Sequence, residues 1–314
     1  MSPPRGDDGP LLTWVLITVG ILGVSLAAPI AAATAAPAIA VAFWRNAMAT
    51  AVGAPYTLVV RPTELVRGPG RRAVRPSVFA GVALAVHFSL WIPSLRMTSV
   101  TAATALVCTT PLFLVAYERA RGAHVPRAVT GGVLLAFAGV LVITGFDAGT
   151  DARAAVGDLM ALAGGAAAAV YMVAGARARE LVSTASYTLV AYGVCAALLG
   201  AACLLAGIPL VGYSARTWVE LVVLTVAAQL FGHTGLNRAM KVAGTTTVGL
   251  AILLEVPGAA LVAWVWLGQV PPVAVVPGAA LVLAGLVLVV RSRAQSRSKG
   301  LSRRAADDVP LGAQ

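Results

Sequence analysis

The sequence predicts an all-α integral membrane protein with ten transmembrane helices, arranged as two inverted repeats of five. Its 314 residues are 59% hydrophobic and 11% charged, with a mean hydropathy of +0.88, whereas soluble domains are about 45–50% apolar and about 25% charged. The apolar residues fall in runs of about 20, long enough to cross a bilayer. A shift of 146 residues superimposes the later runs on the earlier ones.

The ten runs divide the chain into two equal groups. They begin near residues 11, 38, 77, 97 and 126 and near residues 156, 185, 217, 245 and 270. We expect a cytoplasmic tail over 1–10, a first repeat over 11–145, an external linker over 146–155, a second repeat over 156–290 and a basic cytoplasmic tail over 291–314. Ten crossings use about 200 residues, which leaves no room for a soluble catalytic domain.

The first run has an alternative interpretation as a secretory signal, because small residues that offer A-x-A cleavage sites follow it. A signal peptide needs a positive segment before its apolar core. Here Arg5 is balanced by Asp7 and Asp8, so we expect a retained helix.

The net charge of +11 does not indicate nucleic-acid binding, because the basic residues lie between and after the apolar runs. Such a pattern is typical of membrane topology and anionic lipid headgroups. Most of the bases fall on the side that holds both termini, and only Arg96, Arg153 and Arg216 fall on the other. We therefore expect a multi-pass protein of the plasma membrane with both termini in the cytoplasm and the tail from Arg291 solvated and disordered.

The three cysteines, Cys108, Cys195 and Cys203, lie inside apolar runs without the spacing of metal ligands. They are expected to be small hydrophobic residues. We expect no metal and no cofactor.

An internal repeat is visible at the offset of 146. Residues 126–143 align with residues 272–289 with seven identities in 18 positions and no gap, and the same shift places His87 on His233, Pro111 on Pro257 and Gly122 on Gly268. Because each group has an odd number of crossings, the second group enters from the opposite side. Inverted repeats of this kind build the two exchangeable half-states of many secondary transporters.

Polar residues recur every four positions in the eighth run, at Gln229, His233 and Asn237. This spacing predicts a stripe on one helix face, directed at the bundle interior or a cavity. His87 and Trp91 share a face of the third run and correspond to His233 and Asn237 under the repeat. We predict a substrate pathway here, with interhelical hydrogen bonding as the alternative.

Glu255 is the acid deepest within a run, and a carboxylate at a helix centre is too costly to face lipid. Pro257 frees the carbonyl of Leu253, as Pro111 frees that of Val107. Glu255 could bind a cation, carry a proton or pair with Arg45, for which we expect a structural role. Thr104 and Tyr171 are weaker candidates to line a cavity.

Two other classes of function stay open. A membrane-embedded enzyme acting on a lipid-linked substrate would need a cluster of carboxylates, and the candidate is Asp147, Asp151 and Asp158, whose spacing is poor for a magnesium site. A scaffold without transport would tolerate alanine in the polar stripe.

The chain resembles the drug/metabolite transporter superfamily, in particular the bacterial group with two EamA domains, over residues 11 to 291. PAIAVAFWRNAMATA is similar to the family's second helix, LRMTSVTAATALVCTTPLF to its fourth, and the longest likeness is GHTGLNRAMKVAGTTTVGLAILLEVPGAALVAWVWLGQ. The chain departs from the Glu-Pro pair that many members carry, since Val256 separates Glu255 from Pro257. Many members also carry Gly-Glu where this chain reads Gly122-Ala123 and Gly268-Gln269.

The resemblance implies a ten-helix bundle around a central cavity lined by helices one, three, four, six, eight and nine, which carry His87, Thr104, Tyr171, His233, Asn237 and Glu255. It also implies export of amino acids, other metabolites or toxic compounds by alternating access. We expect efflux of a small neutral, zwitterionic or amphipathic solute, with protons as an optional coupling ion. The bilayer is the expected partner, nucleic acid is not, and a homo-oligomer stays open.

Overall fold

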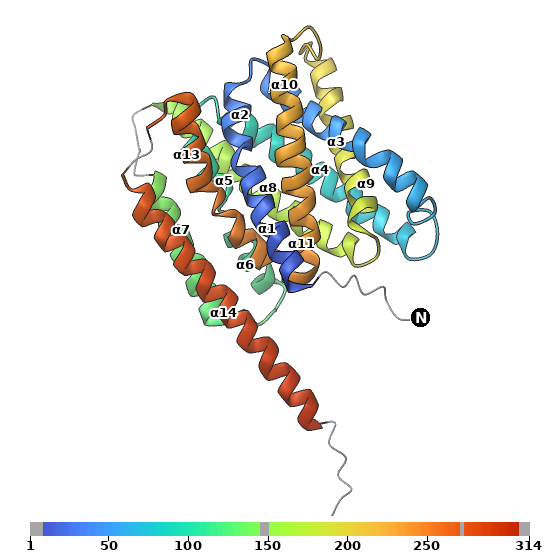
Figure 1. Cartoon of the computed structure of the whole chain (residues 1–314), viewed down its shortest axis with the longest axis vertical. Coiled ribbons are helices and arrows are strands. Elements are labelled where there is room, and N and C mark those ends of the chain that lie inside the picture. The colour runs from blue at the N-terminus through green and yellow to red at the C-terminus, as the bar shows by residue number, and fades with distance from the viewer. Residues whose placement is uncertain (1–8, 145–150, 271–272, 308–314) are drawn as a thin grey trace, which may run out of the picture.

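The computed structural model describes residues 9–144, 151–270 and 273–307, and within these residues it is helical with no strand (Figure 1). Its first half contains α1 (Pro10–Ser25), α2 (Ala27–Ala33), α3 (Ala38–Val60), α4 (Gly70–Ser94), α5 (Val100–Val107), α6 (Thr110–Ala120) and α7 (Arg127–Thr144). Its second half contains α8 (Ala152–Arg179), α9 (Thr184–Leu205), α10 (Ala215–Leu224), the π-helix η1 (Thr225–Thr234), α11 (Gly235–Ala243), α12 (Thr245–Ile252), α13 (Glu255–Leu267) and α14 (Val275–Asp307).

The predicted apolar runs correspond to helices in the structure. Eight helical segments are long and apolar enough to cross a membrane. They are 11–33, 70–94, 100–120, 152–179, 184–205, 215–243, 245–267 and 275–292. The apolar part of α7, Arg127–Val142, is shorter, and α3 is not among the eight. Membrane crossing by all ten runs therefore stays a prediction.

Several of these segments are interrupted by tight turns. Between α5 and α6 the amide of Thr109 donates to the carbonyl of Leu106, and between α12 and α13 the amide of Leu254 donates to that of Ala251. These bonds span three residues, as in a 3₁₀ turn, and they interrupt the regular α-helical pattern. Each interruption is followed within a few residues by a proline, Pro111 or Pro257, which cannot donate a helical hydrogen bond.

The carbonyl that Pro111 leaves free is satisfied locally. The hydroxyl of Thr110 donates to the carbonyl of Val107 at 3.0 Å and lies 3.1 Å from that of Gly165. In the second half the amide of Val256 donates to the carbonyl of Leu253. Both interruptions are thus stable inside an apolar bundle, where unpaired backbone groups are costly.

The helices pack in pairs that join the two halves of the sequence. α3 packs along α9, α4 along α8, α1 along η1 and α11, and α7 along α14, while α5 contacts α13 near the centre. In Figure 1 the α7–α14 pair forms one edge of the bundle. α1 begins and α14 ends at the same end of the bundle.

The chain after Arg291 differs from the expected disordered tail, because α14 continues as a helix to Asp307 and projects beyond the bundle (Figure 1). A membrane-spanning helix supplies the nucleus that an isolated helix lacks, and its extension adds one hydrogen bond per residue. The Ala, Arg, Gln and Lys residues that follow Arg291 have high helix propensity.

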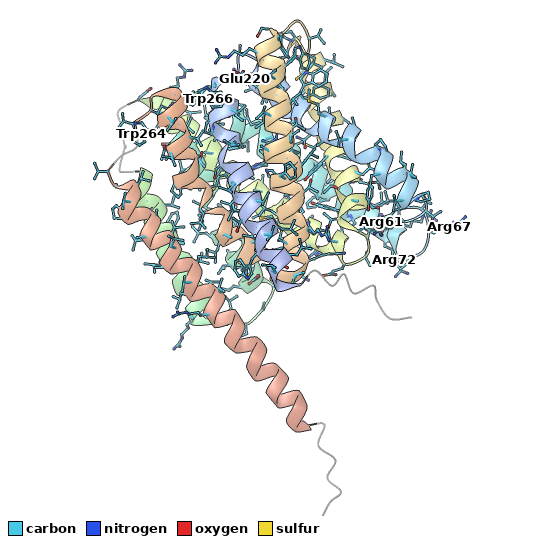
Figure 2. All side chains as sticks on the ribbon, viewed as in Figure 1. Arg61, Arg67, Arg72, Glu220, Trp264 and Trp266 are labelled. Carbon is cyan, nitrogen blue, oxygen red and sulfur yellow. The ribbon has the colours of Figure 1, made fainter. Side chains whose placement is uncertain are left out.

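A group of arginines and two exposed tryptophans lie at opposite ends of the bundle. Arg61, Arg67 and Arg72 lie at one end, and Trp264 and Trp266 lie at the other (Figure 2). The tryptophan side chains are 49% and 43% exposed, as expected for residues at a membrane–water interface. We refer to the first end as the basic end.

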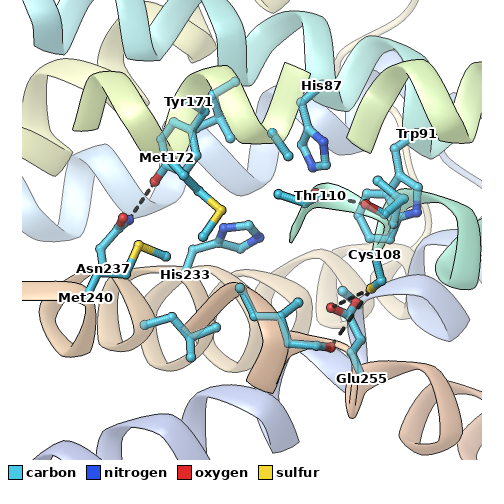
Figure 3. Close-up of a pocket in the computed structure, with 17 residues that line it drawn as sticks. His87, Trp91, Cys108, Thr110, Tyr171, Met172, His233, Asn237, Met240 and Glu255 are labelled. Carbon is cyan, nitrogen blue, oxygen red and sulfur yellow. Dashed lines mark hydrogen bonds between the residues drawn. The ribbon is translucent and has the colours of Figure 1, made fainter. Parts of the chain in front are cut away.

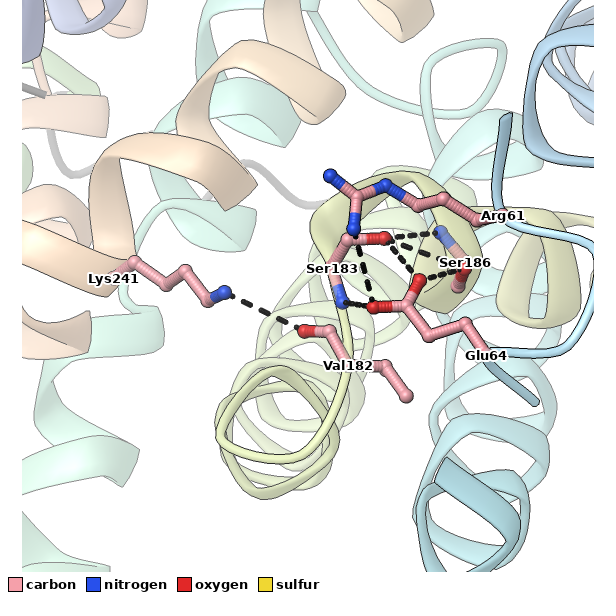
Figure 4. A network of polar contacts seen from close by, with 6 residues as sticks. All are labelled: Arg61, Glu64, Val182, Ser183, Ser186 and Lys241. Carbon is pink, nitrogen blue, oxygen red and sulfur yellow. Dashed lines mark hydrogen bonds and ion pairs between the residues drawn. The ribbon is translucent and has the colours of Figure 1, made fainter. Parts of the chain in front are cut away.

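A loop at the basic end fastens α3 and α4 to the start of α9. The Glu64 carboxylate accepts hydrogen bonds from the amide and hydroxyl of Ser183 and from the hydroxyl of Ser186, and it lies 3.5 Å from Arg61 (Figure 4). Partial burial raises the pKa of Glu64, but the hydrogen bonds from Ser183 and Ser186 outweigh burial, so that pKa lies below its ordinary value of 4.5. The ionised carboxylate is therefore the form that holds the loop.

At the opposite end of the bundle, Arg96 fastens the segment that follows α2. Its guanidinium donates to the carbonyls of Thr34 and Ala36 at 3.0 and 2.5 Å, which satisfies the chain just after α2. Burial lowers the pKa of Arg96. Arg153 in turn donates to the carbonyl of Arg96, and Asp151 caps α8 by accepting from the amide of Arg153.

Candidate functional site

A cavity lies at the centre of the bundle, between α4 and α8 on one side and η1, α11, α12 and α13 on the other (Figure 3). Water can reach about 70 Å³ of it, enough for a few water molecules. Most of the lining is apolar, and the chemistry lies in a few polar side chains. The polar or aromatic residues in the lining are His87, Trp91, Cys108, Thr110, Tyr171, His233, Asn237 and Glu255.

Two histidines approach the cavity from opposite walls (Figure 3). The Nδ1 atom of His87 lies 2.9 Å from the carbonyl oxygen of Gly164, so this nitrogen is the protonated one in a neutral ring. The ring of His87 stacks on that of Trp91 with centroids 5.7 Å apart. The ring of His233 meets that of Phe88 edge to face at 5.8 Å. The two histidines that the predicted repeat relates thus line the same cavity.

Glycines of α8 make this approach possible. A Cβ atom at Gly165 would lie 2.7 Å from the carbonyl oxygen of Val107, and one at Gly164 would lie 3.4 Å from the Cβ of Trp91. With no side chain at either position, α4 and α5 both pack closely against α8. The sequence places His87 and Thr110 on separate helices, and these two glycines let both reach one cavity.

The interrupted helices direct two helix N-termini at the cavity. Thr110 is the first residue of α6, Glu255 is the first residue of α13, and both line it. The Sγ atom of Cys108 lies 4.0 Å from Glu255 Oε2 and 3.9 Å from the carbonyl oxygen of Ile252. The positive end of a helix dipole favours an ionised carboxylate or a bound anion at such a position.

A hydrogen-bonded chain spans the end of the cavity nearer the basic end. Asn237 donates through Nδ2 to the hydroxyl of Tyr171 at 2.5 Å, and its Oδ1 accepts from Arg179 Nη1 at 2.8 Å. The Arg179 guanidinium also lies 4.9 Å from the ring centroid of Tyr187. These contacts tie α8, α9 and α11 together at one mouth of the cavity.

Arg45 lies behind the cavity wall and is fully buried. Its Nε donates to Gln229 Oε1 at 2.9 Å, and its guanidinium lies 4.3 Å from the centroid of the Phe88 ring, which separates it from His233. Both terminal nitrogens of Arg45 lack a hydrogen-bond partner within the described residues. No Arg45–Glu255 bond forms, so the alternative that these two residues pair directly is not observed.

Two of the predicted cavity residues lie elsewhere. The Gln229 side chain joins Arg45 to Asn46, and the Thr104 hydroxyl donates to the carbonyl of Val100 at 2.7 Å within its own helix. Gln229 departs from the stripe because η1 is a π-helix, in which the hydroxyl of Thr234 reaches the carbonyl of Gln229 five residues back. A spacing of four then no longer repeats on one face.

Arg179 belongs to the site although its sequence position did not predict this. Its position after an apolar run is typical of a base that fixes topology, yet the side chain is 3% exposed. Arg179 lies two residues after the more exposed Arg177, so the two side chains point to different faces of α8. This spacing is the sequence signal that could have indicated a buried arginine. Met172, Met240 and Thr110 were also missed, because unbranched and small residues carry no positional signal.

Comparisons with known proteins concern the family of the second half of the chain and the fold. The model of the EamA-like transporter family matches residues 155–291, which is less than half of the chain. A solved crystal structure of a protein is similar with a TM-score of 0.68 and 22% identity, over 88% of this chain and 94% of its own, and this likeness establishes the fold alone. No curated protein matches. Residues 155–291, which contain His233, Asn237 and Glu255, are thus similar to the EamA-like transporter family, which is part of the drug/metabolite transporter superfamily.

Proposed function

We propose that this protein is a secondary-active transporter that exports a small neutral, zwitterionic or amphipathic solute from the cell by alternating access. The observation that carries the proposal is the central cavity, in which residues from both halves of the chain meet. Membrane transporters bind substrate near the midplane, at the interface of their repeats. The direction of export is taken from the resemblance to exporters of the superfamily.

Alternating access by exchange of two half-states needs an inverted repeat, and the α7–α14 pair supports one. A Cβ at Gly132 would lie 2.7 Å from the carbonyl oxygen of Gly285, and one at Gly139 would lie 2.5 Å from that of Gly278. The two contacts run in opposite senses along the two helices, so α7 and α14 are antiparallel. The shift of 146 residues places Gly132 on Gly278 and Gly139 on Gly285, so it exchanges the two contacts. A two-fold axis between the repeats requires this exchange.

The interrupted helices add to this support. The break between α5 and α6 and the break between α12 and α13 lie at positions that the same shift relates, to within one residue. Gly122 and Gly268, a pair that the repeat also relates, both have positive φ, at 76° and 69°. Glycine reaches this left-handed region without strain, and it ends a helix there.

The charges favour a zwitterion as substrate. Glu255 lines the cavity as a carboxylate for an ammonium group. Arg45 lies behind Phe88 with two unpaired nitrogens, and a carboxylate is the group that satisfies a guanidinium bidentately. In this conformation the water-accessible space is small, so the helices must separate, and Phe88 must turn aside, before a solute bridges both charges.

The function is tested by transport into liposomes that contain the purified protein. A panel of neutral amino acids, amphipathic cations and dicarboxylates is offered with and without a pH gradient. We expect saturable movement of zwitterions or amphipathic solutes and a much lower rate for dicarboxylates. Saturable transport of dicarboxylates alone would contradict the proposed substrate class.

The site is tested with matched variants in the same assay. Glu255→Gln and His233→Asn are compared with Glu220→Gln and His124→Asn. Glu220 is an 8% exposed acid, ion-paired with Arg216, and His124 is exposed, and neither lines the cavity. We expect the first pair to lower transport at least tenfold and the second pair to leave it within twofold, since only cavity residues contact the solute. Equal effects in both pairs would move the substrate site elsewhere.

Proton coupling is the finer part of this proposal, with Glu255 or His233 as the carrier. If the coupling ion is a proton, an imposed pH gradient drives wild-type transport, and the Glu255→Gln, His233→Asn double variant exchanges solute without response to the gradient. Wild-type response to the gradient in the double variant would exclude both residues.

A further inference from the structure

A second cavity opens at the basic end of the molecule, between α4, α6 and α8. Water reaches about 670 Å³ of it, far more than in the central cavity. α4 and α6 both pack against α8, and we call the depression between them the α4–α6–α8 groove. Its lining residues are Arg75, Pro76, Phe79, Phe113, Tyr117, Arg121, Ala166, Ala169, Val170, Val173, Ala174 and Arg177.

The groove has a charged end and an apolar end. Arg75 lies near the start of α4, Arg121 follows the last residue of α6, and Arg177 lies in the last turn of α8. Three guanidinium groups from three helices therefore gather where the helices leave the membrane. Farther along the same helices the walls are Phe79, which is 57% exposed, and Val170, which is 42% exposed.

The three arginines are not neutralised by acids in the groove. Its lining holds neither Asp nor Glu. Arg177 donates to the hydroxyl of Tyr117 at 2.5 Å, while the guanidinium groups of Arg75 and Arg121 make no hydrogen bond or ion pair within the described residues. Clustered guanidinium groups repel one another, and a phosphate removes this repulsion while accepting several hydrogen bonds at once.

We infer that the α4–α6–α8 groove binds an anionic phospholipid of the leaflet at the basic end, with its phosphate among Arg75, Arg121 and Arg177. The apolar walls distinguish a lipid from a free phosphate. Phe79, Phe113 and Val170 line the groove on spans that are apolar enough to cross a bilayer, so their side chains contact acyl chains rather than water. Basic pockets between transmembrane helices are suited to anionic headgroups.

The bound lipid would act on three elements that also build the central cavity. α4 carries His87, α8 carries Tyr171, and α6 begins at Thr110. A phosphate that bridges the ends of these helices would stabilise their present separation. The site is nevertheless independent of the proposed transport, because lipid binding is measured without any solute.

The inference is tested by native mass spectrometry of the purified full chain with phosphatidylglycerol or phosphatidylcholine of identical acyl chains. The test variant is Arg75→Ala/Arg121→Ala/Arg177→Ala. The control is Arg67→Ala/Arg71→Ala/Arg72→Ala, which removes the same charge from exposed residues at the same end, outside the groove. Thermal unfolding in detergent verifies that all proteins are folded.

We expect wild-type protein to retain phosphatidylglycerol over phosphatidylcholine, the groove variant to lose at least about tenfold in phosphatidylglycerol binding, and the control to change less than about twofold. Equal losses in the two variants would assign the binding to general surface charge and overturn the inference. Competition by glycerol 3-phosphate at the same concentration would also overturn it, because the site would then recognise a free anion. An Arg→Lys version of the groove variant, which keeps the charge, should retain more binding than the alanine version.

Discussion

Asn237 bonds two buried side chains of α8, Tyr171 and Arg179. It donates to Tyr171 and accepts from Arg179, and all three residues are at most 3% exposed. A buried guanidinium that loses its acceptor retains its desolvation cost. This residue therefore has a structural value that is separable from any contact with a solute.

We predict that Asn237→Ala destabilises the protein by about 1–3 kcal/mol because it leaves Arg179 Nη1 and the Tyr171 hydroxyl without partners. Asn237→Asp should cost less than about 1 kcal/mol, since a carboxylate still accepts from Arg179 and from the tyrosine hydroxyl. Val242→Ala, at a 37% exposed position of the same helix, is the control. Apparent melting temperatures in one detergent rank the stabilities of these variants. An Asp variant as unstable as the Ala variant would contradict the prediction.

At the scale of elements, the α7–α14 pair depends on glycine for a close crossing. Without interhelical hydrophobic driving force, membrane helices associate through close packing of small residues. Gly131 and Gly132 are neighbours in sequence, yet a Cβ at Gly132 would collide with Gly285 and Val289, and one at Gly131 would meet nothing within 4 Å.

We therefore predict opposite results at two adjacent positions. Gly132→Ala should destabilise by about 1–3 kcal/mol because the helices must separate, whereas Gly131→Ala should be neutral or stabilising by up to about 1 kcal/mol because alanine favours the helix. Thermal unfolding of the two variants measures this difference. Equal stability would mean that α7 and α14 do not cross at Gly132.

The loop between α3 and α4 should make the stability of the basic end depend on pH. The pKa of Glu64 is lower in the folded protein than its ordinary value, so its ionised form stabilises the fold above that ordinary value. This contribution disappears as the pH falls through the folded pKa.

We predict that Glu64→Gln lowers stability by about 1 kcal/mol at pH 7, a value reduced for its partial exposure, and that the difference from wild type shrinks as the pH falls below 4.5 and through the lowered pKa of Glu64. Glu180→Gln, at an exposed glutamate in the turn before α9, is the matched control and should show no such difference. Melting curves from pH 7 to pH 3 provide the measurement, and a difference that persists at low pH would show that the carboxylate charge is not the cause.

At the scale of the whole molecule, the group of Arg61, Arg67 and Arg72 at one end of the bundle predicts the orientation. Basic loops stay in the cytoplasm, so the basic end, with the start of α1 and the end of α14, should face inward. A fluorescent protein fused after Gln314 should fluoresce, and alkaline phosphatase fused there should be inactive. The same phosphatase inserted between residues 146 and 150 should be active, and the reverse pattern would invert the topology.

Much of the fold could be predicted because a membrane helix satisfies its own backbone and presents its apolar length directly in the sequence. The start of α3 at residue 38 and that of α12 at residue 245 agree with the predicted positions. The run predicted to begin at residue 77 corresponds to α4, which begins at residue 70, and the run predicted at 270 corresponds to α14, which begins at 275. Arginine or proline near a helix end is compatible with both helix and loop, so the sequence does not fix these starts. Asp147 lies outside the described residues.

The candidate site could be predicted in part. His87, Trp91, Tyr171, His233, Asn237 and Glu255 line the central cavity, since polar residues in apolar helices are costly toward lipid and must face the interior. Gln229 and Thr104 face the interior without reaching the cavity. A polar side chain inside the bundle can either line the cavity or bond to a neighbouring helix, and hydropathy alone does not distinguish these two positions.

Composition and run length were sufficient to determine that the chain is helical and suited to a membrane, because both depend on each residue's own cost of transfer into a bilayer. Tertiary structure alone decided that η1 is a π-helix, that Arg179 is buried, that Arg45 has unpaired nitrogens behind Phe88, and that three arginines border one groove. These features depend on contacts between residues such as Arg45 and Gln229, 184 positions apart, whose approach is set by the packing of several helices at once.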